Sequence, residues 1–256
     1  MPRLKGMPTP NHRIARRIRR TLTPAAAVTS ACTALVAAAT TSSPVYSGTG
    51  WKAETAHGVY SLHPGPYTVV FADSRARTKL APYLKTPASQ VTLSVGVPVT
   101  VTTLLDSTPR SACPGQRRIV VHYVYRPTGK AGISKALPCH NLADGSASGG
   151  HILMDSEYWT STSWFSTNTT LNDAYRKNAV AHELGHILGL DHPNTDRDKD
   201  GAVEAYECVK NKAGWMPVMC SPNGGVRTST GAGKFTTEFD LPGLRQMLRN
   251  YYLRQS

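Results

Sequence analysis

The run from His182 to His192, with the sequence HELGHILGLDH, restricts the fold more than any other segment of the chain. His182 and His186 are four residues apart, so both imidazoles project from one face of a helix. Glu183 lies beside them, and Gly189 can adopt the left-handed conformation that ends a helix. The chain is therefore expected to form a helix, turn at the glycine and return His192 to the other two histidines.

Three imidazole nitrogens would fill three corners of a tetrahedral zinc site and leave the fourth for water, as in catalytic sites. Glu183 stands next to these ligands and can accept a proton from zinc-bound water. A bare His-Glu-x-x-His pattern also arises in helices that bind no metal, and Gly189 and His192 make the longer pattern specific. We predict a zinc ion bound by His182, His186 and His192, with Glu183 as the general base.

Residues 196–207 match the twelve-residue pattern of a calcium loop. Gly201 stands where the loop must bend sharply, and calcium takes six to eight oxygen ligands. The predicted ligands are the carboxylates of Asp196, Asp198, Asp200, Glu204 and Glu207 and the carbonyl of Ala202. Because regulatory loops of this kind usually occur in pairs and this chain has one, we expect a structural calcium ion that rigidifies the segment after His192.

Residues 1–40 have the pattern of a signal peptide. They contain seven basic and no acidic residues, and the basic run from Arg13 to Arg20 precedes an Ala/Val/Leu-rich stretch that ends in small residues. We predict a signal peptide over residues 1–40, a flexible segment or short propeptide over residues 41–65, and a catalytic domain over residues 66–256. A secreted, extracellular protein without stable membrane association after signal cleavage is expected, because no later segment has the roughly 20 apolar residues that span a bilayer.

The formal charge of +13 comes largely from that leader. The 29 basic residues minus the leader's 7 leave 22, against 16 acidic residues, a net charge of +6. This balance, without a basic stripe and interleaved aromatic residues, predicts no nucleic-acid partner.

Four cysteines remain after the leader: Cys113, Cys139, Cys208 and Cys220. An even number in an oxidising compartment favours two disulfides, and three pairings are possible. We favour Cys113 with Cys139 and Cys208 with Cys220, because these pairs close the shorter loops.

The remaining elements follow from residue type and period. Strands are expected at residues 67–71, 91–105 with a bend at Pro98, 118–125 and 151–154. Helices are expected at residues 73–84, 171–190 and 237–252.

The His-Glu-x-x-His-x-x-Gly-x-x-His pattern resembles that of the metzincin metallopeptidases. The run HELGHILGLDHP is most similar to the matrixin branch and its bacterial secreted relatives, and less similar to the snapalysins, which have Asp at the position of His192. The resemblance extends over about residues 66–256 in the order of elements, although its motifs rest on only about forty residues. It implies an α+β fold: a zincin domain with a twisted, mostly parallel sheet, an antiparallel edge strand, a zinc-binding helix, a methionine turn and a C-terminal helix.

The resemblance also implies roles for further residues. Met219 is expected in the methionine turn beneath the zinc, with Met216 as a competitor. The short strand at residues 151–154 is expected to be the edge strand, so the backbone at residues 150–155 would bind substrate. His151, Tyr158 and Tyr206 are each possible partners of the oxyanion.

The function implied is that of a secreted, monomeric zinc endopeptidase that hydrolyses peptide bonds of proteins. The alternative is a non-catalytic, calcium-stabilised, zinc-containing binding or adhesion protein. Retention of Glu183 argues against this alternative, because a structural zinc site needs no base.

Overall fold

The computed structural model describes residues 42–222, 225 and 231–255, and the predicted signal peptide lies outside them. The chain divides into two units, Met1–Thr40 and Thr41–Ser256, and the following concerns the second.

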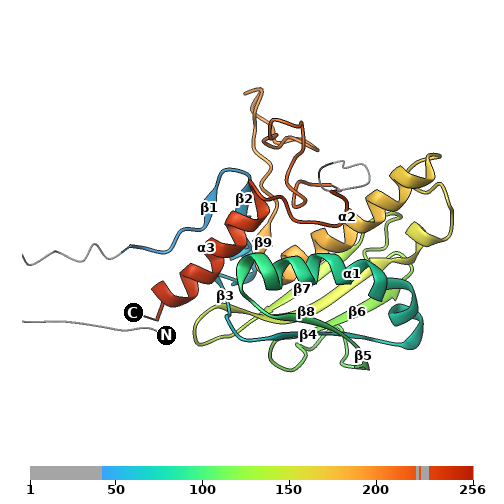
Figure 1. The fold of residues 1–256 in the computed structure, drawn as a ribbon, viewed down its shortest axis with the longest axis horizontal. Coiled ribbons are helices and arrows are strands. Elements are labelled where there is room, and N and C mark those ends of the chain that lie inside the picture. The colour runs from blue at the N-terminus through green and yellow to red at the C-terminus, as the bar shows by residue number, and fades with distance from the viewer. Residues whose placement is uncertain (1–41, 223–224, 226–230, 256) are drawn as a thin grey trace, which may run out of the picture. The chain divides into compact units, whose positions relative to one another are not determined.

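A six-stranded sheet forms one layer of this unit (Figure 1). Its strands are β3 (Ser61–Leu62), β4 (Tyr67–Phe71), β5 (Val99–Leu105), β6 (Arg118–Val124), β7 (Lys135–His140) and β8 (Ser146–Asp155). The order is β3-β8-β6-β4-β5 with all pairs parallel, and β7 adds antiparallel to β8. The mixed α/β architecture with a mostly parallel sheet and an antiparallel edge strand is thus confirmed.

The identity of the edge strand was predicted wrongly. Residues 151–154 belong to β8, which pairs with β6 on one side and β7 on the other, so their backbone is already hydrogen-bonded. The edge strand is β7, which contains Pro138 opposite Gly150. Proline lacks the N–H that an inner strand needs and is tolerated at an edge. Gly150, with φ of 139°, fits between the strands because a Cβ there would lie 2.2 Å from the carbonyl oxygen of Leu137.

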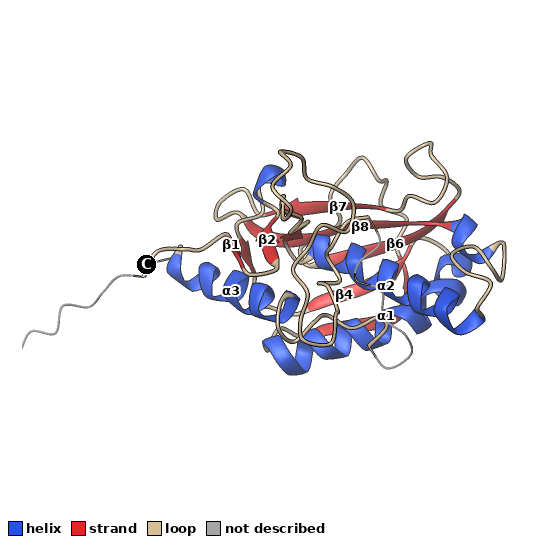
Figure 2. Ribbon diagram, turned by 90° about the horizontal axis from the view of Figure 1, so that it is seen from above, coloured by secondary structure: helices blue, strands red, loops and turns tan. Residues whose placement is uncertain are grey.

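Three α-helices occur in the described residues: α1 (Ser74–Val95), α2 (Thr169–Ile187) and α3 (Asp240–Leu253). Figures 1 and 2 show α1 and α2 side by side over one face of the sheet. The core between these layers contains large buried side chains such as Leu80, Leu84, Ile152 and Leu184. None of the helices in this part of the chain is long and apolar enough to cross a membrane.

Helix α1 is longer than the sequence predicted. It continues to Val95 through Pro82 and Pro87, so residues 91–95, which were expected to be strand, are helical. Each proline removes a helical hydrogen bond, but the buried positions Leu80, Leu84, Ala88, Val91 and Val95 keep a helical period against the sheet. Packing of this apolar stripe therefore outweighs the two prolines.

The N-terminal segment is built into the domain. It forms β1 (Ser47–Gly48), β2 (Trp51–Ala53) and a 3-10 turn, η1 (Thr55–His57), before β3. Strand β2 pairs antiparallel with β9 (Leu190–Asp191), directly after the histidine helix. Trp51, Ala53, Val59 and Leu62 are buried. Residues 47–62 are thus an ordered part of the domain and not the flexible segment that the sequence predicted.

Both disulfides have the favoured pairing. Cys113 bonds to Cys139, which joins the loop before β6 to the edge strand β7. Cys208 bonds to Cys220, which closes the segment between His192 and Met219.

Asp240, at the start of α3, anchors the turn that contains Met219. Its fully buried carboxylate accepts hydrogen bonds from the backbone N–H groups of Val218 (2.9 Å), Met219 (3.2 Å) and Thr236 (2.7 Å) and from the Thr236 hydroxyl (2.6 Å). A carboxylate has acceptor sites for all four donors, and an amide does not.

We therefore expect Asp240→Asn to lower the free energy of unfolding by about 2 kcal/mol or more, because an amide NH₂ would face buried N–H donors and leave them unsatisfied. Urea denaturation at fixed metal content measures this loss. Asp173→Asn removes an exposed pair with Lys177 (2.6 Å) and serves as the control, expected within about 0.5 kcal/mol of the unmodified protein. Equal stability of Asp240→Asn and the control would contradict the anchoring role.

Candidate metal centre

Helix α2 brings His182 and His186 to one place. The helix begins after Asn168, whose side-chain oxygen caps the N–H of Leu171 at 3.0 Å, and it ends at Ile187. Gly189, with φ of 98°, then reverses the chain, and a Cβ there would lie 2.8 Å from Met247 and 2.9 Å from Val59. The turn that returns His192 therefore depends on glycine for its conformation and for its close packing.

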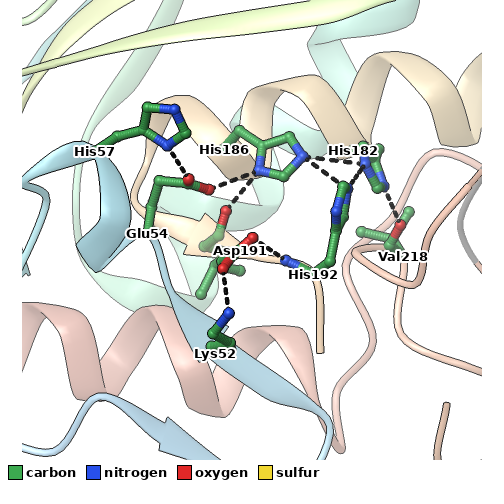
Figure 3. Close-up of polar contacts among 9 residues, drawn as sticks. Lys52, Glu54, His57, His182, His186, Asp191, His192 and Val218 are labelled. Carbon is green, nitrogen blue, oxygen red and sulfur yellow. Dashed lines mark hydrogen bonds and ion pairs between the residues drawn. The ribbon is translucent and has the colours of Figure 1, made fainter. Parts of the chain in front are cut away.

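The Nε2 atoms of the three histidines converge. They are 3.0 Å (His182 to His192), 3.1 Å (His182 to His186) and 3.2 Å (His186 to His192) apart (Figure 3). A tetrahedral zinc with nitrogens at about 2.0–2.1 Å separates those nitrogens by about 3.3 Å. The three imidazoles therefore fit a single zinc ion with only slight adjustment.

Backbone carbonyls determine which ring nitrogen carries the proton. The Nδ1 atom of His182 lies 2.8 Å from the carbonyl oxygen of Val218, and that of His186 lies 2.8 Å from the carbonyl oxygen of Leu190. In a neutral imidazole, an Nδ1–H that donates to such an oxygen leaves a lone pair on Nε2. Burial and the neighbouring imidazoles hold the pKa of His182 well below its usual range. Both rings thus present lone pairs to the point where the three histidines meet.

Glu183 lies in the same cleft as the three histidines and is 8% exposed. Burial raises its pKa to about 7, although the charge of His186 and the backbone N–H of Ala136 on β7 act in the opposite direction. A carboxylate with a pKa near neutrality can both accept and return a proton.

The cleft has a volume of about 500 Å³ and runs between β7 and α2. Residues 132–136 and Pro138 line one side, and Ser221 and Pro222 line another part. The loop before β7 is fixed by Asp155, which accepts from the N–H of Gly132 at 2.8 Å, and by the Tyr158 hydroxyl, which donates to the Gly132 carbonyl at 2.9 Å. The edge strand is thereby held beside Glu183.

Of the three proposed oxyanion partners, two have other roles. The Tyr158 hydroxyl is buried and bonded to Gly132 and Ser134. His151 is 1% exposed and contacts His122 at 2.9 Å and the carbonyl of Ala112 at 2.8 Å, and it does not line the cleft. Tyr206 does not line the cleft either. Of the three, Tyr158 lines the cleft with Glu183 and the histidines, and its hydroxyl is already engaged by Gly132 and Ser134.

Met219 packs directly against the histidine helix. It is fully buried, and a Cβ on Gly185 would lie 2.2 Å from its sulfur. The preceding carbonyl, that of Val218, is the partner of His182. The competitor Met216 packs instead with the Cys208 and Cys220 pair. Met219, and not Met216, is therefore the methionine that packs against the histidine helix.

Asn194 connects the third histidine to this turn. Its side-chain oxygen accepts from the N–H of Ser221 at 2.9 Å, and its NH₂ group donates to the carbonyls of Ser221 (3.1 Å) and Glu204 (3.0 Å). The segment that follows His192 is thus tied to residues next to Met219.

Glu54 was missed by the sequence analysis. Its carboxylate lies 3.0 Å from Nδ1 of His186 and also contacts Nδ1 of His57. Burial lowers the pKa of His186, but the hydrogen bond to Glu54, the charges of Glu183 and Glu54 and the Leu190 carbonyl together outweigh burial, and the pKa is raised. No sequence signal could have identified Glu54, because it is 132 residues away from its partner.

The structure brings together part of the predicted calcium set. Ligand atoms of Asp196, Asp198 and Glu207 lie within 4.8 Å of one another. The carboxylates of Asp200 and Glu204 are not in this group, and that of Asp200 accepts from the N–H of Ala202 at 2.9 Å. Backbone N–H groups of Arg197 and Glu204 hold the pKa of the Glu207 carboxyl below its usual range.

Comparison with known proteins gives little further information. No family model matches the chain, and no curated protein matches it. Among solved structures, the chain is similar to one in the GM1 bound form of the ECX AB5 holotoxin, with 14% sequence identity over 80% of this chain and 87% of that chain and a TM-score of 0.40. A likeness at this level carries no argument about function.

Proposed function

We propose that this protein is a zinc-dependent endopeptidase. The observation that carries the proposal is the convergence of three Nε2 atoms within 3.0–3.2 Å of one another in a cleft that also contains the buried Glu183. Three histidine ligands with an open fourth position are typical of catalytic zinc and not of structural zinc.

Bound at the three histidines, zinc would act as a Lewis acid and lower the pKa of coordinated water toward about 7. Within this scheme Glu183 accepts the proton of the attacking water and later delivers it to the leaving amine. Its raised pKa, about 7, suits both steps. Because Glu183 follows His182 directly on α2, its carboxylate lies next to the metal site.

Strand β7 supports a peptide as the substrate. It pairs with β8 along one edge, and Lys135, Ala136 and Pro138 line the cleft. A peptide in an extended conformation can add to such an edge through main-chain hydrogen bonds, which do not depend on side-chain identity. This assigns to β7 the substrate contact that the sequence analysis assigned to residues 150–155.

A structural calcium ion at residues 196–207 is the second part of the proposal. Three carboxylates at the two ends of the loop, Asp196, Asp198 and Glu207, already lie close together. Like charges so near one another repel unless a cation lies between them. The ion would stiffen the segment that joins His192 to Met219 together with the Cys208 to Cys220 disulfide.

The two disulfides fit an oxidising compartment and so support secretion. The partners we propose are protein or peptide substrates, bound by a monomeric enzyme.

Glu183→Ala is expected to lower casein cleavage by at least about 100-fold, the typical contribution of a general base, while zinc remains bound at one ion per chain. Cleavage rate and zinc content are measured together on each purified variant. Asp173→Asn, on the exposed side of the same helix, is the control and should cleave at the normal rate.

Zinc in both the unmodified protein and Glu183→Ala, without cleavage of casein or peptide libraries by either, would contradict the peptidase. That result would favour the zinc-containing binding or adhesion protein.

Calcium added to zinc-loaded, calcium-free protein should raise the melting temperature by several degrees, because an ion at about 100 times its Kd stabilises the folded state by about 2.7 kcal/mol. Glu207→Gln should lose most of this increase. Arg197→Ala, in the same loop, retains all six predicted ligands and should keep it. A melting temperature unchanged by calcium up to about 10 mM would exclude the structural ion.

A further inference from the structure

We propose that Glu54 is a positioning residue of the metal centre: it holds the imidazole of His186 for metal binding, and the N-terminal segment of the domain delivers it. The inference rests on the zinc site proposed above. It assigns a role to a residue outside the histidine motif and to a segment that the sequence analysis predicted to be flexible or a short propeptide.

The contact itself is direct. Figure 3 shows the Glu54 carboxylate between two imidazoles, with one oxygen toward His57 and the other toward His186. The distance from Oε2 to Nδ1 of His186 is 3.0 Å, and the Nε2 atom of the same ring is one of the three that converge. A hydrogen bond at Nδ1 limits rotation of the ring and so fixes the direction of its Nε2 lone pair.

The burial of Glu54 needs an explanation that the fold alone does not give. The residue is 4% exposed, and its carboxylate partners in the described part of the chain are the two imidazoles, not a lysine or arginine. A carboxylate is costly to bury unless positive charge lies nearby. A metal ion bound to His186 would place that charge one imidazole away.

The backbone of Glu54 is fastened to the turn that completes the site. Its N–H donates to the carbonyl of Gly189 at 2.9 Å, and the preceding Ala53 is paired with Leu190 between β2 and β9. Lys52 forms an ion pair of 2.6 Å with Asp191, the residue before the third ligand. Residues 52–54 thus each contact the turn at residues 189–191. These contacts fix the backbone from which the Glu54 side chain reaches His186.

The far end of this segment is also anchored. The side chain of Asn250 on α3 accepts from the N–H of Val45 at 3.0 Å and donates to its carbonyl at 2.7 Å. Glu54 therefore belongs to a segment that is held at both ends.

The Leu190 carbonyl is a second acceptor for the same Nδ1–H, at 2.8 Å. A neutral carbonyl suffices to select the protonated nitrogen. A carboxylate adds negative charge, which makes the imidazole a stronger metal ligand. The two acceptors therefore have separable effects: loss of Glu54 should weaken metal binding without removing the site.

The test compares zinc affinity, measured by competition with a chromophoric chelator, in the unmodified protein, Glu54→Ala, Glu54→Gln and His57→Ala. Glu54→Ala should weaken zinc binding by about 10–100-fold, the range typical for loss of such an outer partner. Glu54→Gln keeps the shape and one acceptor but removes the charge, and it should weaken binding by a smaller factor. His57→Ala removes only the other partner of the carboxylate and should remain within about twofold.

Visible absorption of the cobalt-substituted proteins supplies a second readout. A change in the cobalt spectrum of Glu54→Ala, absent from His57→Ala, would indicate an altered ligand field at His186. If Glu54→Ala does not fold, as judged by circular dichroism of the metal-free protein, the isosteric Glu54→Gln decides the question.

Zinc affinity of the folded Glu54 variants within twofold of that of the unmodified protein would overturn the inference and leave the zinc site intact. An equal loss in His57→Ala would also overturn it, because the effect would then belong to docking of the segment. Failure of the unmodified protein to bind zinc would overturn both this inference and the proposed function.

Discussion

Three imidazole lone pairs directed at one point repel each other, and most of the architecture around α2 serves to hold them there. The Nε2 atoms lie 3.0–3.2 Å apart, and the opposite nitrogens of His182 and His186 are tied to backbone carbonyls. Such an arrangement is unfavourable without a cation and favourable with one. Folding of this part of the chain and metal binding are therefore expected to be coupled.

The carbonyls that orient the rings come from two turns, and each turn is secured by a distant part of the chain. The N–H groups of the turn at Val218 and Met219 donate to the buried carboxylate of Asp240. The turn at Gly189 and Leu190 is held by pairing with β2. The centre thus depends on contacts between segments more than 130 residues apart in sequence, such as Glu54 and His186. The sheet contributes in another way, since β7 forms the wall opposite Glu183.

What could be predicted from the sequence was mainly local. The histidine spacing follows from the helical period, and the disulfide pairing followed from loop length. Non-local pairing was beyond reach. Strand β7 was not predicted, because it contains Pro138 and a proline argues against a strand unless that strand is known to lie at an edge. The second half of α1 was not predicted as helix, because Pro82 and Pro87 argue against one. Its stability comes from packing on the sheet. The Ser/Gly-rich start of the N-terminal segment led to a prediction of flexibility. The pairing of β2 with β9 could not be foreseen, because it depends on where the histidine helix ends. For the same reason Glu54 carried no signal.

X-ray absorption at the zinc edge of the purified protein tests most directly whether the three histidines share one zinc ion. We expect three imidazole nitrogens and one further oxygen, all at about 2.0–2.1 Å, without sulfur. Sulfur scattering at about 2.3 Å, or fewer than three imidazoles around the zinc, would contradict a shared three-histidine site.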